Sequence, residues 1–467
     1  MLGLLLLGYA LFSKPFAYLG VPPVYIGEAI LVLGLVQLLR VRSWSWLLEH
    51  PAWALLGLLG ALTLARTVPM LGPYGLDAAR DAMLVGYALF AVVMAALVVE
   101  RPERLPTLVR RYRVLAVAVV LFGWAIFLVV KTVGEGLPSL PWAADVPVLE
   151  SKAGDLLVHL AGITAFIVVG FVRRRPWLLG FLALSVGLAV VSTRGGMVAW
   201  TLGVGAAWLL RPPTARVGGL AYAFAALVTL GVLLGPDLTV NGGTRMVSVE
   251  QVWLNVQSLF GSAGTETLDG SRTWRERWWG EIWDYTVHGP YFWQGKGYGV
   301  NLAVADGFSV SEDHALRSPH NGHLTVLARS GVPGFVLWGL VQLAWLGSVL
   351  RAWLAARRAG RWAWMGLFAV LVAFWTAASV NGAFDVYLEG PMGGVWFWSV
   401  WGIGLAAAGL QRRHPDLLDG LLHRAAVPPP QPPAWTWGGG APGPSQETQA
   451  QTIGLGRGTA QGHGPRP

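Results

Sequence analysis

Residues 317–334 read Arg-Ser-Pro-His-Asn-Gly-His-Leu-Thr-Val-Leu-Ala-Arg-Ser-Gly-Val-Pro-Gly, and a membrane-length apolar run follows them. The polar pair His320-Asn321 comes directly after a proline, and one helical turn of apolar residues follows the pair. The glycines and the proline of residues 331–334 predict a break in the helix. An ionisable side chain at the point where a chain enters the bilayer is costly, so His320 is a candidate functional residue.

The composition is that of a helical membrane protein. Of 467 residues, 54% are hydrophobic and only 13% are charged, whereas globular chains carry about 25% charged residues. Apolar runs long enough to cross a hydrocarbon core of about 30 Å recur along the chain, and a β-barrel would show short alternating segments instead. The lack of cysteine excludes disulfides and thiolate metal ligands. The net charge of +9 is attributed to cytoplasmic loops and not to nucleic acid binding.

The apolar pattern predicts an all-α polytopic membrane protein with about twelve transmembrane helices. The predicted spans are 2–20, 22–39, 51–66, 78–99, 114–131, 154–172, 176–192, 194–210, 217–235, 334–350, 362–380 and 391–410. The first span is interrupted by Lys14-Pro15. It is interpreted as retained, because residues 1–12 have no basic segment and no small-residue cleavage site.

Arginines concentrate in alternate loops, and this alternation predicts the orientation. They are Arg40, Arg42, Arg101, Arg104, Arg110, Arg111, Arg113, Arg173, Arg174, Arg175, Arg211, Arg216, Arg351, Arg357, Arg358, Arg361, Arg412 and Arg413. Cytoplasmic loops carry an excess of basic residues, so this side of the membrane is predicted to be the cytoplasm. Both ends of the chain are then predicted to be cytoplasmic.

Four regions follow from this interpretation. They are spans one to nine in 1–235, an extracytoplasmic loop with the histidine-bearing helix in 236–333, the last three spans in 334–410, and a cytoplasmic tail in 411–467. The loop is rich in tryptophan, which suits a membrane surface, and loops of this length are usually functional. The tail is rich in Pro, Gly and Gln from residue 425 onward and is predicted to be disordered.

His320 is the candidate catalytic residue, and Asn321 and His323 are candidates for substrate binding. Histidine titrates near neutral pH, which suits a general base or acid. The alternative is a structural histidine that is bonded to backbone. His323 lies one turn further on, so both rings are expected on one helix face, where His323 orients His320 or packs. No metal is expected, because neither cysteine nor an obvious third ligand accompanies the pair.

Arg194 and Arg80 are candidate phosphate contacts on the extracytoplasmic side. Arg194 lies in residues 192–196 (STRGG), between two apolar runs, where the two glycines let a bulky group approach the backbone. A guanidinium group offers a planar set of donors that suits phosphate oxygens. The alternative for Arg194 is contact with lipid headgroups. Arg80 lies next to Asp77 and Asp81, so an ordinary ion pair is the alternative for it.

Arg272 is the third candidate for binding phosphate. It follows Asp269 and Ser271, and this stretch is expected to form a turn and then a helix capped by one of these two residues. The free N–H groups of such a helix start favour anions. Arg275 and Arg277, further along the same helix, are interpreted as part of a solvated basic face.

The motifs described above follow one another along the chain in a specific order. An arginine before small residues at a span start is followed by Gly-Ser-Arg with a nearby tryptophan in a large loop, then by residues 295–299 (GKGYG), and finally by His320-Asn321 and residues 331–334 (GVPG). Together they resemble the O-antigen ligase and polymerase superfamily of bacterial membrane glycosyltransferases, over nearly the whole chain. The resemblance implies a GT-C-like fold with a large periplasmic loop between spans nine and ten.

The resemblance also implies the reaction and its residues. His320 corresponds to the family's essential periplasmic histidine, and Arg194 and Arg272 correspond to its essential arginines. The implied donor is a glycan on undecaprenyl pyrophosphate in the bacterial inner membrane, with membrane lipids around it and with no metal, cofactor or nucleotide sugar. The acceptor hydroxyl belongs to lipid A core, as in lipopolysaccharide biosynthesis, to another glycan, as in a polymerase, or to a protein, as in a protein O-oligosaccharyltransferase.

The chemistry of such a transfer agrees with these residues. A base must deprotonate the acceptor hydroxyl, and cations must stabilise the leaving pyrophosphate. A Mg²⁺ site would need clustered carboxylates, and those expected on this side are scattered. They are Glu266, Asp269, Asp306, Glu312 and Asp313. A transporter of lipid-linked saccharide is an alternative that predicts mid-span charges and repeat symmetry. A non-catalytic scaffold, the third hypothesis, would tolerate the loss of His320.

Overall fold

The computed structural model describes residues 1–21, 24–215, 240–242, 245–247, 266–310, 312 and 315–422. The helices are α1 (Leu2–Ala17), α2 (Ile26–Leu38), α3 (Pro51–Thr67), α4 (Leu71–Tyr74), α5 (Leu76–Gly86), α6 (Leu89–Glu100), α7 (Arg104–Val133), α8 (Ala153–Val169), α9 (Pro176–Ser192), α10 (Arg194–Leu210), α13 (Glu266–Trp283), α14 (Leu302–Ala305), α15 (Gly322–Arg358), α16 (Trp362–Gly382) and α17 (Pro391–Arg413). Short helical turns are η1 (Ser45–Leu48), η2 (Val68–Met70), η3 (Gly134–Gly136) and the π-helical η5 (Asp284–His288). The antiparallel strand pairs are β1 (Gly20–Val21) with β2 (Val24–Tyr25), β3 (Ser139–Leu140) with β4 (Ala143–Pro147), and β5 (Val240–Gly242) with β6 (Arg245–Val247).

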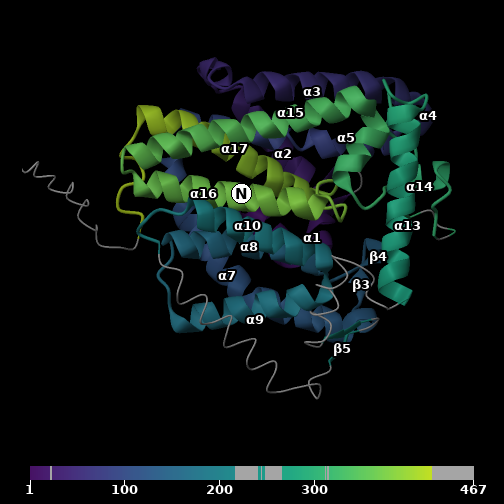
Figure 1. Ribbon diagram of the computed structural model, residues 1–467, viewed down its shortest axis with the longest axis horizontal. Coiled ribbons are helices and arrows are strands. Elements are labelled where there is room, and N and C mark those ends of the chain that lie inside the picture. The colour runs from purple at the N-terminus through teal and green to yellow at the C-terminus, as the bar shows by residue number, and fades with distance from the viewer. Residues whose placement is uncertain are drawn as a thin grey trace, which may run out of the picture. The chain divides into compact units, whose positions relative to one another are not determined.

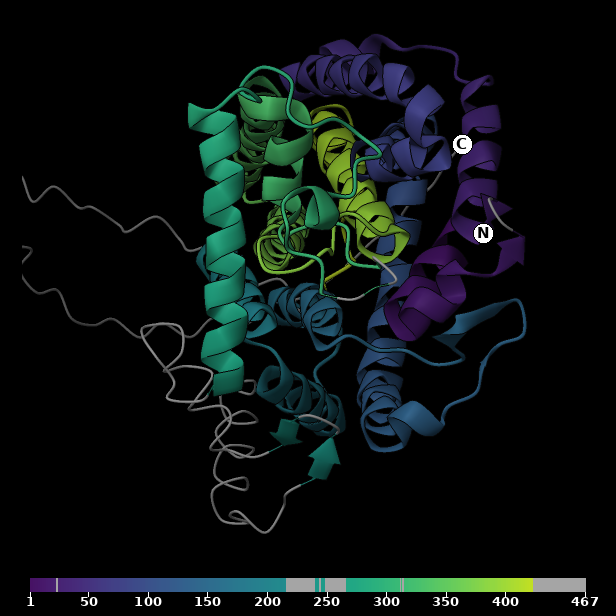
Figure 2. The ribbon, with the colours of Figure 1, turned by 90° about the vertical axis from the view of Figure 1, so that its right-hand side faces the viewer.

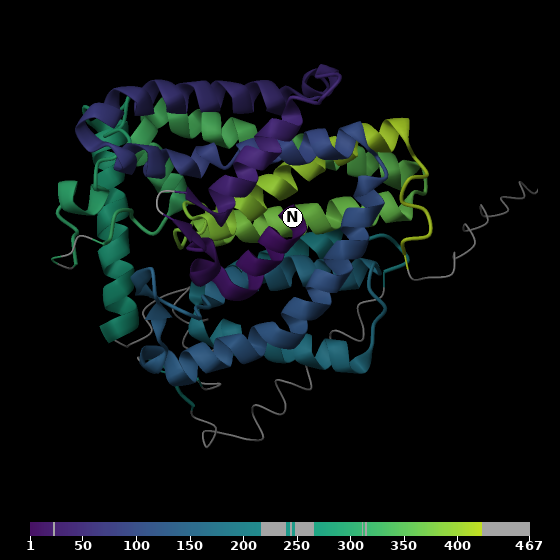
Figure 3. The same cartoon turned by 180° about the vertical axis from the view of Figure 1, so that it is seen from behind.

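Most of the long helices lie alongside one another, and one helix lies across their ends. In Figure 1, α3, α15, α16, α8 and α9 run alongside each other, and α13 crosses their right-hand ends. Figure 3 shows the same crossing from behind, and Figure 2 looks onto the end of the bundle with α13 in front. Helix α17 is buried along almost its whole length, because α1, α6, α15 and α16 pack around it.

Small residues allow these helices to approach closely. A Cβ atom on Gly203 of α10 would lie 2.8 Å from the carbonyl oxygen of Ala373 in α16. A Cβ atom on Gly402 of α17 would meet the backbone of Ala91 in α6. Membrane helices commonly use such contacts, because van der Waals packing replaces the hydrophobic effect between helices in lipid.

Among the described residues, five helical stretches are long and apolar enough to cross a membrane, and six if the bent pair α5–α6 forms one span. They are Pro51–Tyr74, α7, α15, α16 and α17, and the shorter apolar helices are α1, α2, α8 and α9. Helix α1 is kinked at Ser13, next to the predicted interruption at Lys14-Pro15. The helical fold class is therefore confirmed, whereas the number of about twelve spans remains a prediction. The span predicted for 217–235 lies outside the described residues.

Helix α15 is broken where the sequence predicts a break. Gly331 has φ 69° and ψ −174°, and a proline lies two residues beyond it. A kink of this kind frees backbone groups, which must find partners if the helix is in a membrane. The preceding loop supplies them: the Val332 N–H donates to the Phe292 carbonyl at 2.8 Å, and the Lys296 N–H donates to the Ala328 carbonyl at 2.7 Å.

The packed part of the chain extends beyond the predicted last span. Helix α17 continues to Arg413, and the indole N–H of Trp364 donates to the carbonyl of Pro415 at 2.6 Å. Leu418 and Leu421 are buried. The predicted tail boundary at residue 411 is therefore corrected, because apolar side chains after that point still pack against helix ends. The part of the predicted tail from residue 423 onward lies outside the described residues.

Candidate active site

The candidate site lies at the end of the bundle where α8, α10, α15 and α17 begin and α16 ends. Small residues bring three of these ends together. A Cβ atom on Gly196 of α10 would lie 3.0 Å from the Cα of Gly154 in α8, and one on Gly154 would lie 2.8 Å from Oδ1 of Asn381 in α16. Helix N-termini carry a partial positive charge, so their convergence favours anionic groups at this end.

His320 occupies a strained backbone position immediately before α15. Its φ of 53° lies in the left-handed region, which bulky residues rarely adopt and which is enriched at functional sites. Asn321 is the N-cap of α15, and its Oδ1 accepts from the N–H groups of His323 and Leu324 at 3.1 Å each. The expectation that His320 and His323 share a helix face is therefore wrong, because the helix begins after His320. Substrate contact by Asn321 remains a prediction.

His320 is paired with a carboxylate from a distant loop. Its Nδ1 lies 3.4 Å from Oδ1 of Asp385, in the loop between α16 and α17. Burial raises the pKa of Asp385, but the His320 hydrogen bond and the Lys152 charge outweigh it, so the pKa falls below its ordinary value. An ionised carboxylate only accepts hydrogen bonds, so the proton of a neutral His320 lies on Nδ1. Nε2 is then the nitrogen that can accept a proton.

His323 lies in the packing between helices. Its Nε2 is 2.9 Å from the carbonyl oxygen of Ser379 in α16, and its Nδ1 accepts from the indole N–H of Trp338 at 3.1 Å. Both ring nitrogens are therefore engaged with α15 and α16. Of the two roles expected for His323, the structure supports packing, and a substrate contact by this residue remains a prediction.

Helix α13 carries Arg272, and it begins earlier than the sequence predicts. Asp269 and Ser271 lie inside the helix, which starts at Glu266, so the predicted turn and cap at these positions are wrong. A cap contributes only about 1 kcal/mol, whereas each residue added to an existing helix gains a backbone hydrogen bond. Arg272 pairs with Glu276 one turn further on, with Nε and Oε1 2.6 Å apart, and its side chain is 42% exposed.

Two other side chains of α13 dock this helix onto the site. Arg275 Nη1 donates to the carbonyl of Phe384 at 2.9 Å, and the Trp279 indole N–H donates to the carbonyl of Pro319 at 2.9 Å. The expectation of a solvated Arg275 is therefore wrong, because the crossing of α13 over the helix ends brings this residue against the loop that carries Asp385. Arg272 lies one turn before Arg275, so both occupy the same side of α13.

Arg194 is the first residue of α10, at the same end of the bundle. The Thr193 side chain caps the helix by accepting from the Gly196 N–H at 3.3 Å. A Cβ atom on Gly195 would lie 2.6 Å from the side chain of Phe384. The two glycines therefore admit neighbouring parts of the chain, and not a bulky ligand as the sequence predicts. A phosphate contact by Arg194 remains a prediction.

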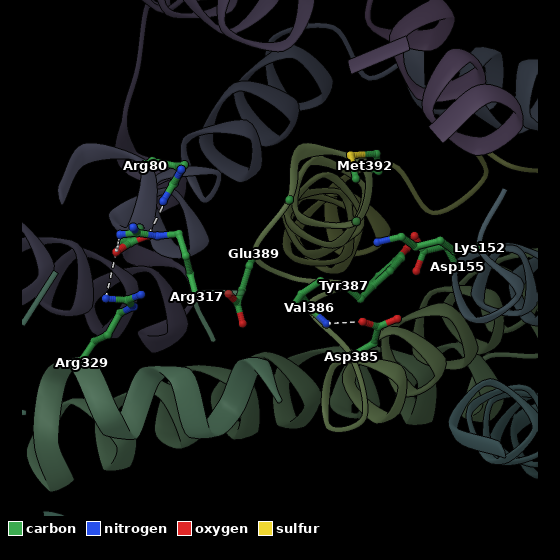
Figure 4. A pocket seen from close by; sticks show the side chains of 13 residues that line it. Arg80, Lys152, Asp155, Arg317, Arg329, Asp385, Val386, Tyr387, Glu389 and Met392 are labelled. Atoms are coloured by element: carbon green, nitrogen blue, oxygen red, sulfur yellow. Dashed lines mark hydrogen bonds and ion pairs between the residues drawn. The ribbon is translucent and has the colours of Figure 1, made fainter. Parts of the chain in front are cut away.

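A cavity of about 220 Å³ adjoins Asp385, and arginines line one end of it. Arg317 bridges Asp77 and Asp81 at 3.1 Å to each, and Arg329 lies 2.9 Å from Asp81. Arg80 pairs with Asp77 at 3.2 Å, which confirms the ion pair given as its alternative. Figure 4 shows the three arginines gathered on one side of the cavity. Three cations face two carboxylates here, so this end is net positive.

The opposite end of the cavity has a different chemistry. Lys152, Asp155 and Tyr387 line it with Asp385, and Figure 4 shows the Tyr387 ring directed toward Lys152 and Asp155. An oxygen of Asp155 accepts from the side-chain amide of Asn381 at 3.4 Å. Burial lowers the pKa of Lys152, but the charges of Asp155 and Asp385 outweigh it and raise the pKa above its ordinary value. Two carboxyl groups and one ammonium group line this end, so it lacks the excess of positive charge found at the arginine end.

Glu389 lies between the two ends (Figure 4). Burial raises its pKa above the ordinary value, although the Thr325 hydroxyl, which donates to Oε1 at 2.8 Å, and the Arg329 charge act in the opposite direction. A carboxyl group with a raised pKa gains and loses its proton closer to neutral pH. The cavity is therefore lined by a carboxyl group, Glu389, that can exchange protons in addition to the His320–Asp385 pair.

The motif GKGYG at residues 295–299 supports the arginines from behind. Its three glycines have φ values of 63°, 86° and 96°, a region that favours glycine. The Gly299 N–H donates to Asp81 at 3.0 Å, and its carbonyl accepts from Arg317 at 2.9 Å. A further carbonyl of the motif accepts from Arg329 at 3.2 Å. The motif is therefore a backbone scaffold for the positive end of the cavity.

Comparison with known protein families identifies the central part of the chain. Residues 179–339 match the family described as O-Antigen ligase. This segment belongs to the O-antigen ligase family. The resemblance carried by Arg194, Arg272 and His320 is thus confirmed, because all three lie in the O-antigen ligase segment, while their individual roles remain predictions. A search of curated proteins found no match.

Most of the charged residues that line the cavity were not predicted as site residues from the sequence. The missed residues are Lys152, Asp155, Arg317, Arg329, Asp385, Tyr387 and Glu389. Asp385 and Glu389 could have been identified as candidates from the sequence, because they lie between two membrane-length apolar runs, where carboxylates are costly. Five of the seven lie outside both the O-antigen ligase segment and the quoted motifs: Lys152, Asp155, Asp385, Tyr387 and Glu389.

Four carboxyl groups outside the predicted set line this cavity. Asp81, Asp155, Asp385 and Glu389 all line it, although they come from three separate parts of the chain. Asp81 and Asp155 lie beside cations, as the contacts above describe. Within the described ranges, no group of three or more His, Cys, Asp or Glu side chains is arranged to hold a metal ion.

Proposed function

We propose that this chain is a membrane glycosyltransferase of the O-antigen ligase type. In this proposal it moves a glycan from undecaprenyl pyrophosphate to an acceptor hydroxyl at the periplasmic face of the bacterial inner membrane. The observation that carries the proposal is the His320–Asp385 pair beside a cavity whose far end presents three arginines. Membership of residues 179–339 in the O-antigen ligase family supports the reaction class.

His320 acts as the general base in this reaction. Nε2 takes the proton of the acceptor hydroxyl, and the hydroxyl oxygen forms a bond to the anomeric carbon of the donor. The bond between that carbon and the pyrophosphate oxygen breaks, and undecaprenyl pyrophosphate leaves. Asp385 holds the ring and stabilises the imidazolium ion that forms, as the acidic member of a catalytic triad does. A positioned base of this kind contributes about 10²–10⁴-fold to the rate.

The arginines stabilise the charge that develops on the leaving pyrophosphate. Arg80 lines the positive end of the cavity with a side chain that is 56% exposed, so it can rotate onto a phosphate. Arg317 lies behind it and is held by two aspartates. Such preorganised donors act most strongly where water is excluded. Arg194 and Arg272, at the same end of the bundle, are proposed as further contacts of the lipid-linked donor.

The test is transfer by the purified protein in lipid. A donor with a labelled glycan on undecaprenyl pyrophosphate is supplied with candidate acceptors that carry a saccharide, lipid or protein hydroxyl. We expect label to move to an acceptor and undecaprenyl pyrophosphate to be released in equal amount. Movement of intact donor across a liposome membrane without any transfer would instead support the transporter alternative.

The proposed orientation makes a separate prediction. The chain has no cysteine, so single cysteines can be introduced at Val310, which is exposed near α13, and at Arg358, at the far end of α15. We expect a membrane-impermeant maleimide to label Val310→Cys in cells whose outer membrane alone is permeabilised. Arg358→Cys should react only after the inner membrane is opened, because basic loops are retained in the cytoplasm. The reverse pattern would contradict the periplasmic site.

A further inference from the structure

The acceptor side of the cavity can be inferred from the end opposite the arginines. The cavity has one end built for anions, around Arg80 and Arg317, and one end lined by Lys152, Asp155 and Tyr387. Only the second end lies next to Asp385, the partner of the proposed base. An acceptor hydroxyl must reach that base, so the groups beside Asp385 surround the acceptor and not the pyrophosphate.

Tyr387 provides the observation that points to a ligand at this end. Its side chain is 4% exposed, and its hydroxyl has no hydrogen-bond partner within the described part of the chain. Buried hydroxyl groups are normally hydrogen-bonded, and leaving one unpaired costs about 1–3 kcal/mol. The ring is directed toward Lys152 and Asp155 across the cavity (Figure 4), so the hydroxyl is available to a group that enters there.

The charges at this end select the kind of group that enters. This end offers two carboxyl groups and one ammonium group, so it lacks the excess of positive charge that favours a pyrophosphate at the arginine end. Carboxylates accept hydrogen bonds from hydroxyl groups, while Lys152 donates and the Tyr387 hydroxyl both donates and accepts. A sugar ring carries several hydroxyl groups at fixed spacing and can use all of these at once. A serine or threonine side chain offers one hydroxyl, which His320 itself would occupy.

We infer that the Lys152–Asp155–Tyr387 end of the cavity binds the hydroxyl groups of a saccharide acceptor. The inference rests on the proposed function and deepens it, because it selects a glycan acceptor over a protein hydroxyl. Tyr387 and Asp155 are binding residues that hold the acceptor ring so that one hydroxyl faces Nε2 of His320. The two ends of the cavity thus bind different substrates, the arginine end the pyrophosphate and the opposite end the hydroxyl groups of the acceptor.

The inference is tested by comparing acceptors and variants in the transfer assay. Oligosaccharides released from the envelope of the host cell and a peptide rich in Ser and Thr are offered to the full-length protein in lipid. We expect transfer to the oligosaccharides and not to the peptide. Tyr387→Phe removes only the hydroxyl, and it should raise the KM for the oligosaccharides about three- to tenfold while the Kd for the donor stays at the wild-type value.

Tyr9→Phe is the matched control, since the Tyr9 hydroxyl is also buried and unpaired within the described residues but Tyr9 does not line the cavity. It should leave both constants unchanged. Asp155→Asn keeps the shape of the side chain and should also raise the acceptor KM, which guards against a misfolded Tyr387 variant. An unchanged acceptor KM in both cavity variants, or preferred transfer to the peptide, would overturn the inference and leave the transferase proposal standing. Failure of the wild type to transfer to any acceptor would reject the proposed function itself.

Discussion

The His320→Ala protein is expected to lose about 10²–10⁴-fold in turnover, the contribution of a positioned general base, and to bind the lipid-linked donor as tightly as the wild type. In the proposed mechanism, Nε2 of His320 acts on the acceptor hydroxyl, while arginines at the other end of the cavity hold the pyrophosphate. The loss should therefore appear in kcat and not in donor affinity, as for an interaction made mainly in the transition state. Single-turnover transfer and donor binding by the purified protein measure the two quantities.

Two further variants and a chelator test the same mechanism. Arg80→Ala should show the opposite pattern, with weaker donor binding, because its exposed side chain lines the positive end of the cavity. His414→Ala is the matched control, since His414 is exposed beyond the end of α17, and it should behave as the wild type. Wild-type turnover of His320→Ala would remove the base assignment. Inhibition by EDTA that a divalent ion reverses would overturn the metal-free mechanism.

The Asp385→Asn protein is expected to lose turnover on the order of 10²–10⁴-fold while it remains folded. The Val386 N–H donates to Oδ1 of Asp385 at 2.8 Å, and Nδ1 of His320 lies 3.4 Å from the same oxygen, so an amide oxygen in that position can still accept from both groups. The substitution removes the negative charge that stabilises the imidazolium ion formed when Nε2 takes the acceptor proton. The measurement is kcat beside donor Kd and thermal unfolding.

Asp416→Asn provides the control for this substitution. Asp416 pairs with Arg361 at 3.2 Å, near the end of α17 remote from the cavity, and its side chain is 82% exposed. It should keep wild-type kcat, since a surface ion pair contributes about 0–1 kcal/mol. Asp385 is a positioning residue, so its loss should change kcat with little change in donor affinity. Wild-type kcat in Asp385→Asn would show that the carboxylate does not stabilise the imidazolium ion of His320.

The helices were predictable because apolar runs of membrane length dominate the sequence, and so was the break at Gly331 beside a proline. His320 was predictable because a histidine beside such a run is costly to place. The pairing of His320 with Asp385 was not, since the two residues lie 65 positions apart and meet only after α15 and α16 have packed. Hydropathy shows which segments are apolar, but it does not show which loop ends are neighbours.

The start of α13 was predicted incorrectly. Local preferences place a cap at Asp269 or Ser271, yet the helix runs through both positions. A cap preference is worth only about 1 kcal/mol, so it does not by itself decide where a helix begins.

The two glycines after Arg194 were assigned to a ligand, whereas Phe384 and the start of α8 occupy the space beside them. Here contacts with remote parts of the chain, which the sequence does not show, fill the space.

The break in α15 links the biogenesis of the protein to the loop that precedes this helix. The backbone of α15 around Gly331 is completed by hydrogen bonds with Phe292 and Lys296. In lipid, unsatisfied backbone groups cost several kcal/mol each, so α15 cannot settle at its final depth until residues 291–299 have docked. That loop must therefore fold against α15 before the last helices close around α17, and assembly of the C-terminal part should wait on the folding of a segment that lies earlier in the chain.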